Sequence, residues 1–385
     1  MTPGLLSGNR ITLLQNGVEF FPELEASIEA AQHEIHLETY IFANDVTGRT
    51  IAAALSRAAL RGVTVRLVLD GFGSKALPSQ LLNEMRRDGV EILIFRPEPG
   101  ILHLRRNRLR RLHRKLCMID GRTAFVGGIN IIDDMDTPGQ IPPRYDYAVR
   151  VEGPVLAQIA PVMRRLWKLV KWTQGRRVHR LHSVAVHSAP AGEQQAALLI
   201  RDNLRHRRDI EEAYLDAINA ARDEIIIANA YFLPGIRFRR ALIEAAGRGV
   251  RVSLLLQGRV EYRLLHYASR ALYGQFLAAG ITICEYHKSF LHAKVAVIDQ
   301  RWATVGSSNI DPFSLLLARE ANIVLEDHAF AGQLHASLQA AIDTGSRCLV
   351  HDHWLHRPWY KRSLGWLAYG TVRFMMGMLG YGKLN

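Results

Sequence analysis

Two stretches of the chain share one pattern: His113-Arg114-Lys115-Leu116-Cys117-Met118-Ile119-Asp120 and His292-Ala293-Lys294-Val295-Ala296-Val297-Ile298-Asp299. Both read H-x-K-x-x-x-x-D, and each is followed by a Gly/Asn block, Gly127-Gly128-Ile129-Asn130 or Gly306-Ser307-Ser308-Asn309. The apolar residues between Lys and Asp are typical of a buried β-strand. Because alternate side chains of a strand share a face, each histidine points the same way as its lysine. The pattern therefore predicts two equivalent strands with an imidazole and an ammonium group at one end.

The sequence around these motifs repeats as well. Ile28-Glu29-Ala30-Ala31 corresponds to Ile218-Asn219-Ala220-Ala221, and Arg61-Gly62-Val63 corresponds to Arg248-Gly249-Val250. Helical patterns lead into apolar runs that are typical of buried strands, which predicts a sheet with helices on both faces. We therefore expect an α/β fold of two similar lobes from an internal duplication. The expected division is a first lobe at 1–173, a linker at 174–196, a second lobe at 197–348 and a tail at 349–385.

Composition narrows the possible partners and the compartment. The chain has 49 Lys and Arg against 36 Asp and Glu, a net charge of +13, which favours nucleic acid or an anionic membrane as a partner. Hydrophobic residues make up 48% of the chain and exclude global disorder. Cys117, Cys284 and Cys348 are scattered, so we expect neither a disulfide framework nor a zinc site, and a reducing compartment. The first 17 residues show no secretory signal.

The motif residues suit phosphate chemistry. An imidazole can attack or protonate, and a lysine beside it supplies a cation for phosphate oxygens. Asn130 and Asn309 can donate hydrogen bonds to a phosphate. For Asp120 and Asp299 two roles are open, contact with the phosphate or closure of the motif through hydrogen bonds. The chain offers no P-loop, dinucleotide fingerprint or metal-ligand cluster, so we expect no cofactor and no metal.

The paired motifs resemble the phospholipase D superfamily and, more closely, bacterial cardiolipin synthases of the B type. The stretches 37–42, 146–154, 227–232 and 303–312 add to this resemblance. It implies two α/β/α lobes related by a pseudo-twofold axis, with one active site shared between them.

The resemblance also implies a mechanism. One histidine attacks the phosphorus of a phosphodiester, the other protonates the departing alcohol, and a phosphohistidine results. We expect His113 to be the nucleophile, His292 the acid and base, and Lys115 and Lys294 the ligands of the phosphate oxygens. Asp146 and Glu320 sit where relatives carry a carboxylate that orients a histidine. Glu320 as a surface partner of Arg319 is the alternative.

The implied activity is transfer of a phosphatidyl group to phosphatidylglycerol, from phosphatidylglycerol or phosphatidylethanolamine, in phospholipid biosynthesis. The alternatives are a nuclease or phosphodiesterase acting on nucleic acid, a hydrolytic phospholipase D and a phosphatidylserine synthase. We expect phospholipid substrates and an anionic membrane as partners, and no nucleic acid. The oligomeric state is left open.

Three segments favour an anionic membrane surface. Two are basic, and they contain Arg105, Arg106, Arg108, Arg110, Arg111 and Arg114, then Arg164, Arg165, Trp167, Lys168, Lys171, Trp172, Arg176 and Arg177. The second has an ordinary solvated helix as its alternative. The third is the apolar tail from Trp354, where Arg373 would cost about 2.5–3.5 kcal/mol at the centre of a span. We therefore expect a tail that lies in the interface rather than spanning, and a peripheral protein on the cytoplasmic side of a bacterial inner membrane.

Overall fold

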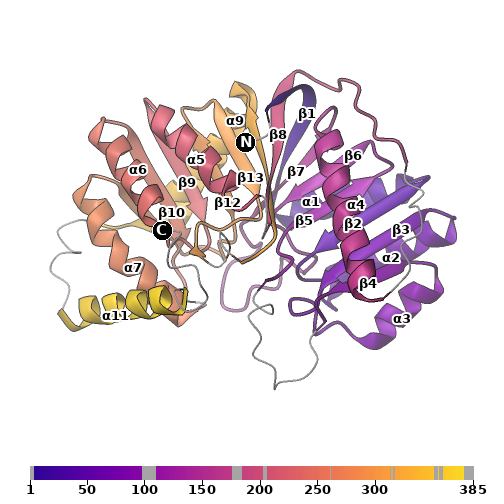
Figure 1. Ribbon diagram of the computed structural model, residues 1–385. Coiled ribbons are helices and arrows are strands. Elements are labelled where there is room, and N and C mark those ends of the chain that lie inside the picture. Colours follow the sequence, from indigo (N-terminus) through magenta and orange to yellow (C-terminus); the bar gives the residue numbers. More distant parts are fainter. Residues whose placement is uncertain are drawn as a thin grey trace.

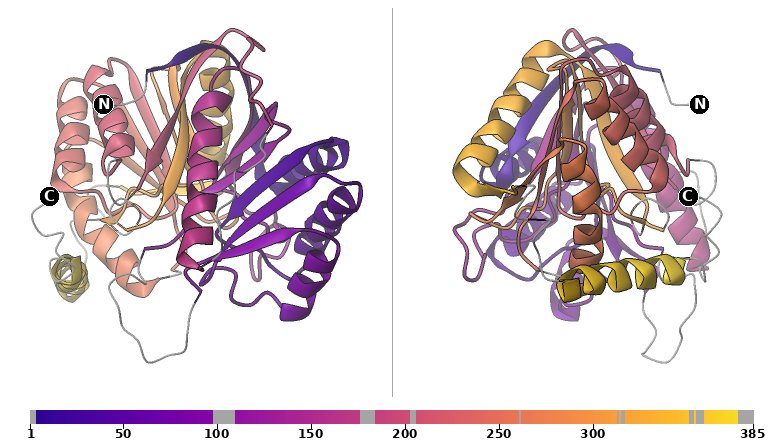
Figure 2. Two further views of the ribbon diagram at one scale, coloured as in Figure 1. Left: turned by 45° about the vertical axis from the view of Figure 1, so that its right-hand side comes forward. Right: turned by 90° about the vertical axis from the view of Figure 1, so that its left-hand side faces the viewer.

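The computed structural model describes residues 4–97, 110–175, 184–202, 206–260, 262–312, 314, 317–350, 354 and 359–376. Its centre is a 15-stranded sheet in the order β15-β11-β10-β9-β12-β13-β14-β8-β1-β7-β6-β5-β2-β3-β4 (Figure 1). Figure 2 shows helices on both faces of this sheet. The predicted α/β architecture is therefore confirmed.

The first lobe takes up the amino-terminal half of the chain. Its elements are β1 (Leu6–Gln15), α1 (Asn16–Ala30), β2 (Glu34–Thr39), α2 (Val46–Leu60), β3 (Thr64–Asp70), α3 (Ser79–Arg87), β4 (Glu91–Phe95), β5 (Lys115–Ile119), β6 (Thr123–Gly127), β7 (Tyr147–Glu152) and α4 (Leu156–Thr173).

The second lobe repeats most of these elements. They are β8 (Gln194–Arg201), α5 (Asp209–Ala220), β9 (Glu224–Asn229), α6 (Ile236–Gly247), β10 (Arg251–Gln257), α7 (Arg263–Ala278), β11 (Thr282–Tyr286), β12 (Lys294–Ile298), β13 (Trp302–Gly306), β14 (Glu320–Glu326) and α9 (His328–Gly345), followed by β15 (Ser346–Cys348) and α11 (Trp359–Met376).

The strand order confirms the predicted duplication. Counted from its outer edge to the junction, the first lobe runs β4-β3-β2-β5-β6-β7-β1 and the second runs β11-β10-β9-β12-β13-β14-β8, so equivalent strands lie in opposite order on the two sides of the β8–β1 junction. In each lobe three parallel strands are followed by antiparallel ones. The lobes join where β1 pairs antiparallel with β8, at Leu6 opposite Ala196 and Asn9 opposite Gln194.

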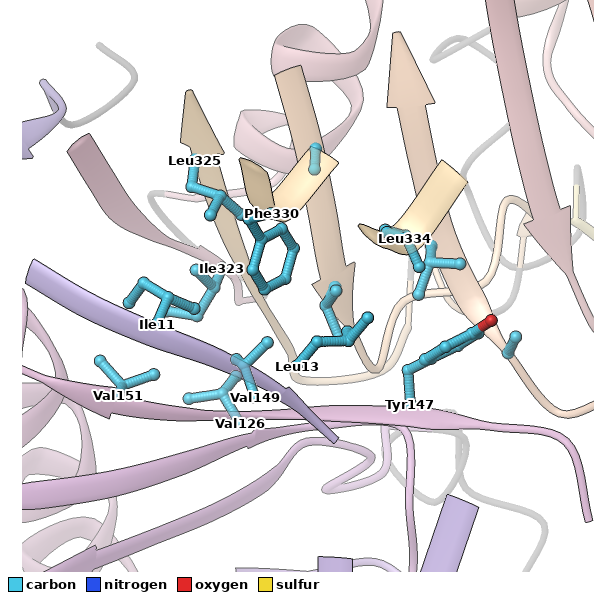
Figure 3. Packing of buried hydrophobic residues seen from close by; sticks show 14 of the residues in the cluster. Ile11, Leu13, Val126, Tyr147, Val149, Val151, Ile323, Leu325, Phe330 and Leu334 are labelled. Atoms are coloured by element: carbon cyan, nitrogen blue, oxygen red, sulfur yellow. The ribbon is translucent and has the colours of Figure 1, made fainter. Parts of the chain in front are cut away.

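The interface between the lobes is a hydrophobic core and not only a shared strand edge. Figure 3 shows Ile11, Leu13 and Val149 of the first lobe packed against Ile323 and Leu325 of the second. Phe330 and Leu334 of α9 close the same cluster. Burial of apolar surface contributes about 25 cal/mol per Å². We infer that this core fixes the position of one lobe relative to the other.

The cysteine prediction was wrong in one respect. Cys284 and Cys348 form a disulfide, because β15 returns antiparallel beside β11 and places the two residues opposite each other. They are 64 residues apart in the chain, so their spacing gave no sign of this pairing. Cys117 is a buried free cysteine of β5, as expected, and burial raises the pKa of its thiol.

The segments expected at a membrane behave differently from one another. Trp167 of α4 is fully buried in the first lobe, whereas Trp172 near the end of the same helix is 72% exposed, so a membrane contact of this segment stays a prediction. Arg114 is also buried. The last residues of the expected linker, from Gln194, already belong to β8. The expectations for Arg105, Arg106, Arg108, Arg176 and Arg177 lie outside the described residues.

The helix α11 lies along the lower edge of the second lobe, beside α7 (Figures 1 and 2). It buries Ala368, Val372 and Met376 in the core of that lobe. Of the helices in the described part of the chain, none is long and apolar enough to cross a bilayer. Residues 351–353, 355–358 and 377–385 of the expected tail lie outside the described residues.

A buried ion pair holds the start of β5 in place. Arg114 Nε donates to Glu38 Oε2 at 2.5 Å, and Nη2 donates to Glu38 Oε1 at 3.1 Å and to the Val162 carbonyl at 3.3 Å. The pair therefore connects β2, β5 and α4 directly beside His113.

We predict that Arg114→Met lowers the free energy of unfolding by about 3–5 kcal/mol, because it leaves the Glu38 carboxylate buried without its partner. The double variant Glu38→Met/Arg114→Met should lose clearly less, since it leaves no unpaired charge. Urea unfolding measures both. A single variant as stable as the double one would contradict the prediction.

Candidate active site

The two histidines meet at the boundary between the lobes. His113 precedes β5 by two residues, and His292 precedes β12 by two residues. The backbone N–H of His113 donates to the Arg319 carbonyl at 3.0 Å, and that of His292 donates to the Tyr145 carbonyl at 2.8 Å. Each histidine is thus hydrogen-bonded through its backbone to the other lobe. The motifs, far apart in the sequence, lie in one site.

Each imidazole is oriented by a carboxylate from the other lobe. His113 Nδ1 lies 3.0 Å from Glu320 Oε1 and 3.1 Å from Oε2, and His292 Nδ1 lies 2.6 Å from Asp146 Oδ2. A carboxylate accepts the Nδ1–H proton, which leaves Nε2 with its lone pair. In the chain Asp146 follows His113 and Glu320 follows His292. In the structure each carboxylate instead contacts the histidine of the other motif, so that Asp146 pairs with His292 and Glu320 with His113. Glu320 is fully buried, so its alternative as a surface partner of Arg319 is excluded.

The two carboxylates accept hydrogen bonds from different kinds of donor. Ser307 Oγ donates to Glu320 Oε2 at 2.5 Å, and the Tyr147 N–H donates to Asp146 Oδ1 at 2.8 Å. Gly128 occupies the place of Ser307 in the first motif, and a Cβ there would collide with Asp146. Ser307 had not been singled out from the sequence. The signal was present, because Gly128/Ser307 is one of the two differences between the blocks Gly127-Gly128-Ile129-Asn130 and Gly306-Ser307-Ser308-Asn309.

The two lysines make this site electropositive. Lys115 Nζ donates to the His113 carbonyl at 2.6 Å, Lys294 Nζ donates to the His292 carbonyl, and Lys294 Nζ lies 3.9 Å from Asp146 Oδ2. Burial, and then Lys294, lowers the pKa of Lys115 to about 7. A bound anion would relieve this repulsion and favour the charged lysines. The site is therefore suited to an anionic group.

The same environment disfavours charged imidazoles. Burial and then Lys294 lower the pKa of His292 to about 3, and burial also lowers the pKa of His113. Burial alone would raise the pKa of Asp146, but Lys294 and His292 hold it below its usual value. Both histidines are therefore neutral at pH 7 before an anion binds.

Aromatic rings flank the two histidines unequally. The Tyr40 ring lies edge-on to His113 with centroids 4.9 Å apart, and Lys115 Nζ is 5.5 Å from the centre of that ring. On the other side Phe290 stacks on His292 at 6.2 Å. Tyr40 and Ala230 are the residues that follow β2 and β9, so this tyrosine has no equivalent in the second lobe. The two halves of the site are related but not identical.

The two asparagines hold loops at the edge of the site. Asn130 Oδ1 accepts the Ile41 N–H at 3.1 Å, and Asn309 Oδ1 accepts the Tyr231 N–H at 3.4 Å. Their oxygens are engaged by backbone, so any bond to phosphate would come from the amide nitrogens. Asn130 also lines a cavity of about 80 Å³ together with His292 and Asp146.

Asp120 and Asp299 lie at the opposite end of their strands, about 15 Å from the lysines at the rise of a β-strand. Asp120 accepts backbone N–H groups of 32–34, each at 2.8 Å, and Asp299 accepts those of 222–224, each at 2.9 Å. Both have positive φ, 50° and 51°. The structure does not bring them to the site, and of their two possible roles the hydrogen bonds favour closure of the motif.

We predict that Asp120→Ala and Asp299→Ala each lower the free energy of unfolding by about 1–3 kcal/mol, because three backbone N–H groups, one of them part-buried and two exposed, lose their charged acceptor. Turnover per folded molecule should stay within about twofold of the parent. Unfolding curves and activity, normalised to folded protein, test this. The comparison variant is His113→Ala at the other end of β5. It should lose turnover while its free energy of unfolding changes little. Loss of turnover in well-folded Asp120→Ala would contradict the prediction.

In the part of the chain that the structure covers, no group of three or more His, Cys, Asp or Glu side chains could hold a metal ion.

The fold and the paired motifs together define a protein of the phospholipase D type. A solved structure described as phosphatidylserine synthase of Haemophilus influenzae Rd KW20 superposes with a TM-score of 0.71 at 14% identity, covering 98% of this chain and 97% of the other. That likeness concerns the fold alone.

Sequence comparison narrows the class to one family. The family described as "Cardiolipin synthase, PLD-like domain" matches residues 24–167 and 214–342. The protein named cardiolipin synthase B of Escherichia coli (strain K12) is 39% identical over 374 residues, which is 97% of this chain and 90% of the relative. The protein of that name from Salmonella typhi is 40% identical over 381 residues, or 99% and 92%. The chain belongs to the cardiolipin synthase family of phospholipase D-like proteins.

Proposed function

We propose that the chain is a cardiolipin synthase, which transfers a phosphatidyl group from one phospholipid to the free hydroxyl of phosphatidylglycerol. The observation that carries the proposal is the pair of crossed histidine–carboxylate contacts with two buried lysines between the lobes. The two imidazoles supply a nucleophile and an acid–base group, and the lysines supply positive charge for one phosphodiester. Close similarity to cardiolipin synthases over nearly the whole chain supports the choice of substrate.

The first half-reaction forms a covalent intermediate. His113 Nε2 attacks the phosphorus of the donor while Glu320 keeps the Nδ1 proton in place. The bond from phosphorus to the headgroup oxygen breaks, and His292 Nε2 gives that oxygen a proton. His292 must carry this proton when the donor is bound, although its pKa is low in the free protein. The anionic phosphodiester favours the imidazolium, and so does Asp146.

The second half-reaction returns the enzyme to its first state. His292 Nε2 takes the proton of the acceptor hydroxyl, and the resulting oxygen attacks phosphorus. The bond between phosphorus and His113 Nε2 then breaks. One phosphodiester is exchanged for another, so the reaction needs no activated nucleotide. Lys115 and Lys294 offset the charge that the phosphoryl oxygens carry in both transition states.

We predict that His113→Ala and His292→Ala each lower cardiolipin formation at least 10³-fold, because each imidazole has a separate step to perform. The assay uses mixed vesicles of phosphatidylglycerol and phosphatidylethanolamine, with thin-layer separation of products. Acid-labile, base-stable labelling of the protein by phosphate-labelled donor should be absent from His113→Ala.

The matched control for this test is His328→Ala, an exposed histidine at the start of α9. It should retain full activity. A parent protein that releases only phosphatidic acid would make the chain a hydrolytic phospholipase. Cleavage of single-stranded DNA or RNA without cardiolipin formation would make it a nuclease.

We further propose that the protein works at the cytoplasmic surface of a bacterial inner membrane, held peripherally. The face of α11 that points away from α7 exposes Leu364, Trp366, Leu367 and Phe374, which we call the outer apolar face. Their exposed fractions run from 45% to 68%. A helix that buries one side in its lobe and presents Trp, Leu and Phe on the other suits an interface between headgroups and acyl chains.

We predict that replacing Trp366, Leu367 and Phe374 by Ser reduces vesicle flotation several-fold in about 0.5 M salt, where electrostatic attraction is screened. Substitution is a cleaner test than deletion of α11, because deletion would uncover the apolar side of α7. The control is Val46→Ser, which changes another exposed apolar residue on the first lobe. Unchanged flotation of the triple variant would remove α11 from the membrane contact.

A further inference from the structure

Two neighbouring cavities lead away from His292. The inner one, of about 80 Å³, is lined by His292, Asp146 and Asn130. The outer one, of about 280 Å³, is lined by Arg259, Thr137, Gln140 and Val260, among others. Arg144 and Phe290 line both cavities, so the two adjoin at these side chains. The volume of the outer cavity corresponds to that of about nine water molecules, which leaves room for a phosphodiester headgroup.

The guanidinium groups of Arg144 and Arg259 lie along this path, and both contact neutral groups. Arg144 lies over the Phe290 ring at 5.2 Å and donates to the Asp136 carbonyl at 3.2 Å. Arg259 donates to the Gly139 carbonyl. Among the described residues no carboxylate lies within ion-pairing distance, 4.0 Å, of either guanidinium. Planar guanidinium groups in such a position are well suited to bind phosphate oxygens.

Two acidic side chains line the inner cavity together with Arg144: Asp146, whose carboxylate contacts His292, and Asp134. Burial raises the pKa of the Asp134 carboxyl to about 7, although Arg144 acts in the opposite direction. At neutral pH this group therefore offsets only part of the positive charge.

The lobes differ at this point, so Arg259 is not a by-product of the duplication. Gln257 ends β10 where Asp70 ends β3, and its amide donates to the Leu291 carbonyl. In the first lobe Asp70 Oδ1 lies 3.9 Å from an arginine, Arg111. Two residues further along, Arg259 stands where the first lobe has Phe72. The second lobe thus has a neutral amide and an added cation at these two places.

We propose that Arg144 and Arg259 form a subsite for the phosphodiester of the acceptor lipid, a contact that decides transfer to phosphatidylglycerol rather than to a neutral alcohol. The inference rests on the proposed function. The acceptor carries its own phosphodiester one glycerol unit away from the attacking hydroxyl. When that hydroxyl lies at His292 and the reacting phosphorus lies between the two histidines, the second anionic group must lie beyond His292. The arginine-lined cavity is on that side, which agrees with His292 as the base for the acceptor.

The test compares acceptors with one fixed donor, phosphatidylethanolamine, in mixed micelles of the full chain. The acceptors are phosphatidylglycerol, its deacylated form glycerophosphoglycerol, and glycerol, which has no phosphate. We expect Arg144→Gln and Arg259→Gln to lower kcat/KM at least tenfold for the first two acceptors, mainly through KM. With glycerol both variants should stay within about twofold of the parent. Arg259→Lys, which keeps the charge, should recover part of the loss.

The control is Arg301→Gln, an exposed arginine paired with Glu326 in the turn between β12 and β13, at the other end of the strand from Lys294. It should leave all three reactions unchanged. Equal losses with glycerol and phosphatidylglycerol, or no loss with either, would overturn the proposed subsite. So would a loss confined to phosphatidylglycerol, which would assign the arginines to the acyl chains. A parent that makes no cardiolipin but transfers to glycerol would refute the proposed function, whereas the variant-to-parent ratios for glycerophosphoglycerol and glycerol would still decide the subsite.

Discussion

The crossed pairing of histidine and carboxylate is the constraint on which this structure depends. His113 is oriented by Glu320 and His292 by Asp146, so neither lobe contains a complete catalytic group. A histidine that acts as a nucleophile or a base needs a fixed tautomer, and a contact across an interface can fix it only if the interface is rigid. The β1–β8 pairing and the shared hydrophobic core supply that rigidity. The backbone bonds of the two histidines to Tyr145 and Arg319 add to it at the site itself.

The electrostatics of the site follow from the same arrangement. Two lysines, two carboxylates and two imidazoles lie together in a largely buried volume, where charge is expensive unless it is compensated. In the free protein the positive charge of the site is not fully balanced, as the lowered pKa values of Lys115 and His292 indicate. An anionic phosphodiester adds the missing negative charge. Binding therefore favours the charged form of Lys115 and a protonated His292, as the proposed first step requires.

Duplication has given two related half-sites, and small differences distinguish the surroundings of the two histidines. Ser307 supports Glu320 where Gly128 makes room for the shorter Asp146. Tyr40 flanks His113, whereas Ala230 follows the corresponding strand. Each change alters the surroundings of one histidine while the strand that carries it stays the same. A symmetric scaffold can in this way hold one residue for attack on phosphorus and the other for proton transfer.

The sequence by itself determined the duplicated α/β lobes and the two strands that present histidine and lysine, because period-2 patterning and repeats are local properties of the chain. Only the tertiary structure decided which carboxylate serves which histidine, since Asp146 and Glu320 are placed by the docking of the lobes. The tertiary structure also decided the pairing of Cys284 with Cys348, because the two residues meet only through the return of β15. It likewise decided the burial of Arg114 and Trp167, although the basic and aromatic residues around them in the sequence favoured a membrane surface. Asp120 and Asp299 belong to the motif in sequence, but a strand of five residues separates them from the histidines and places them at the opposite end of β5 and β12. Long-range pairing is decided by which surfaces the folded lobes bury, and no local pattern contains that information.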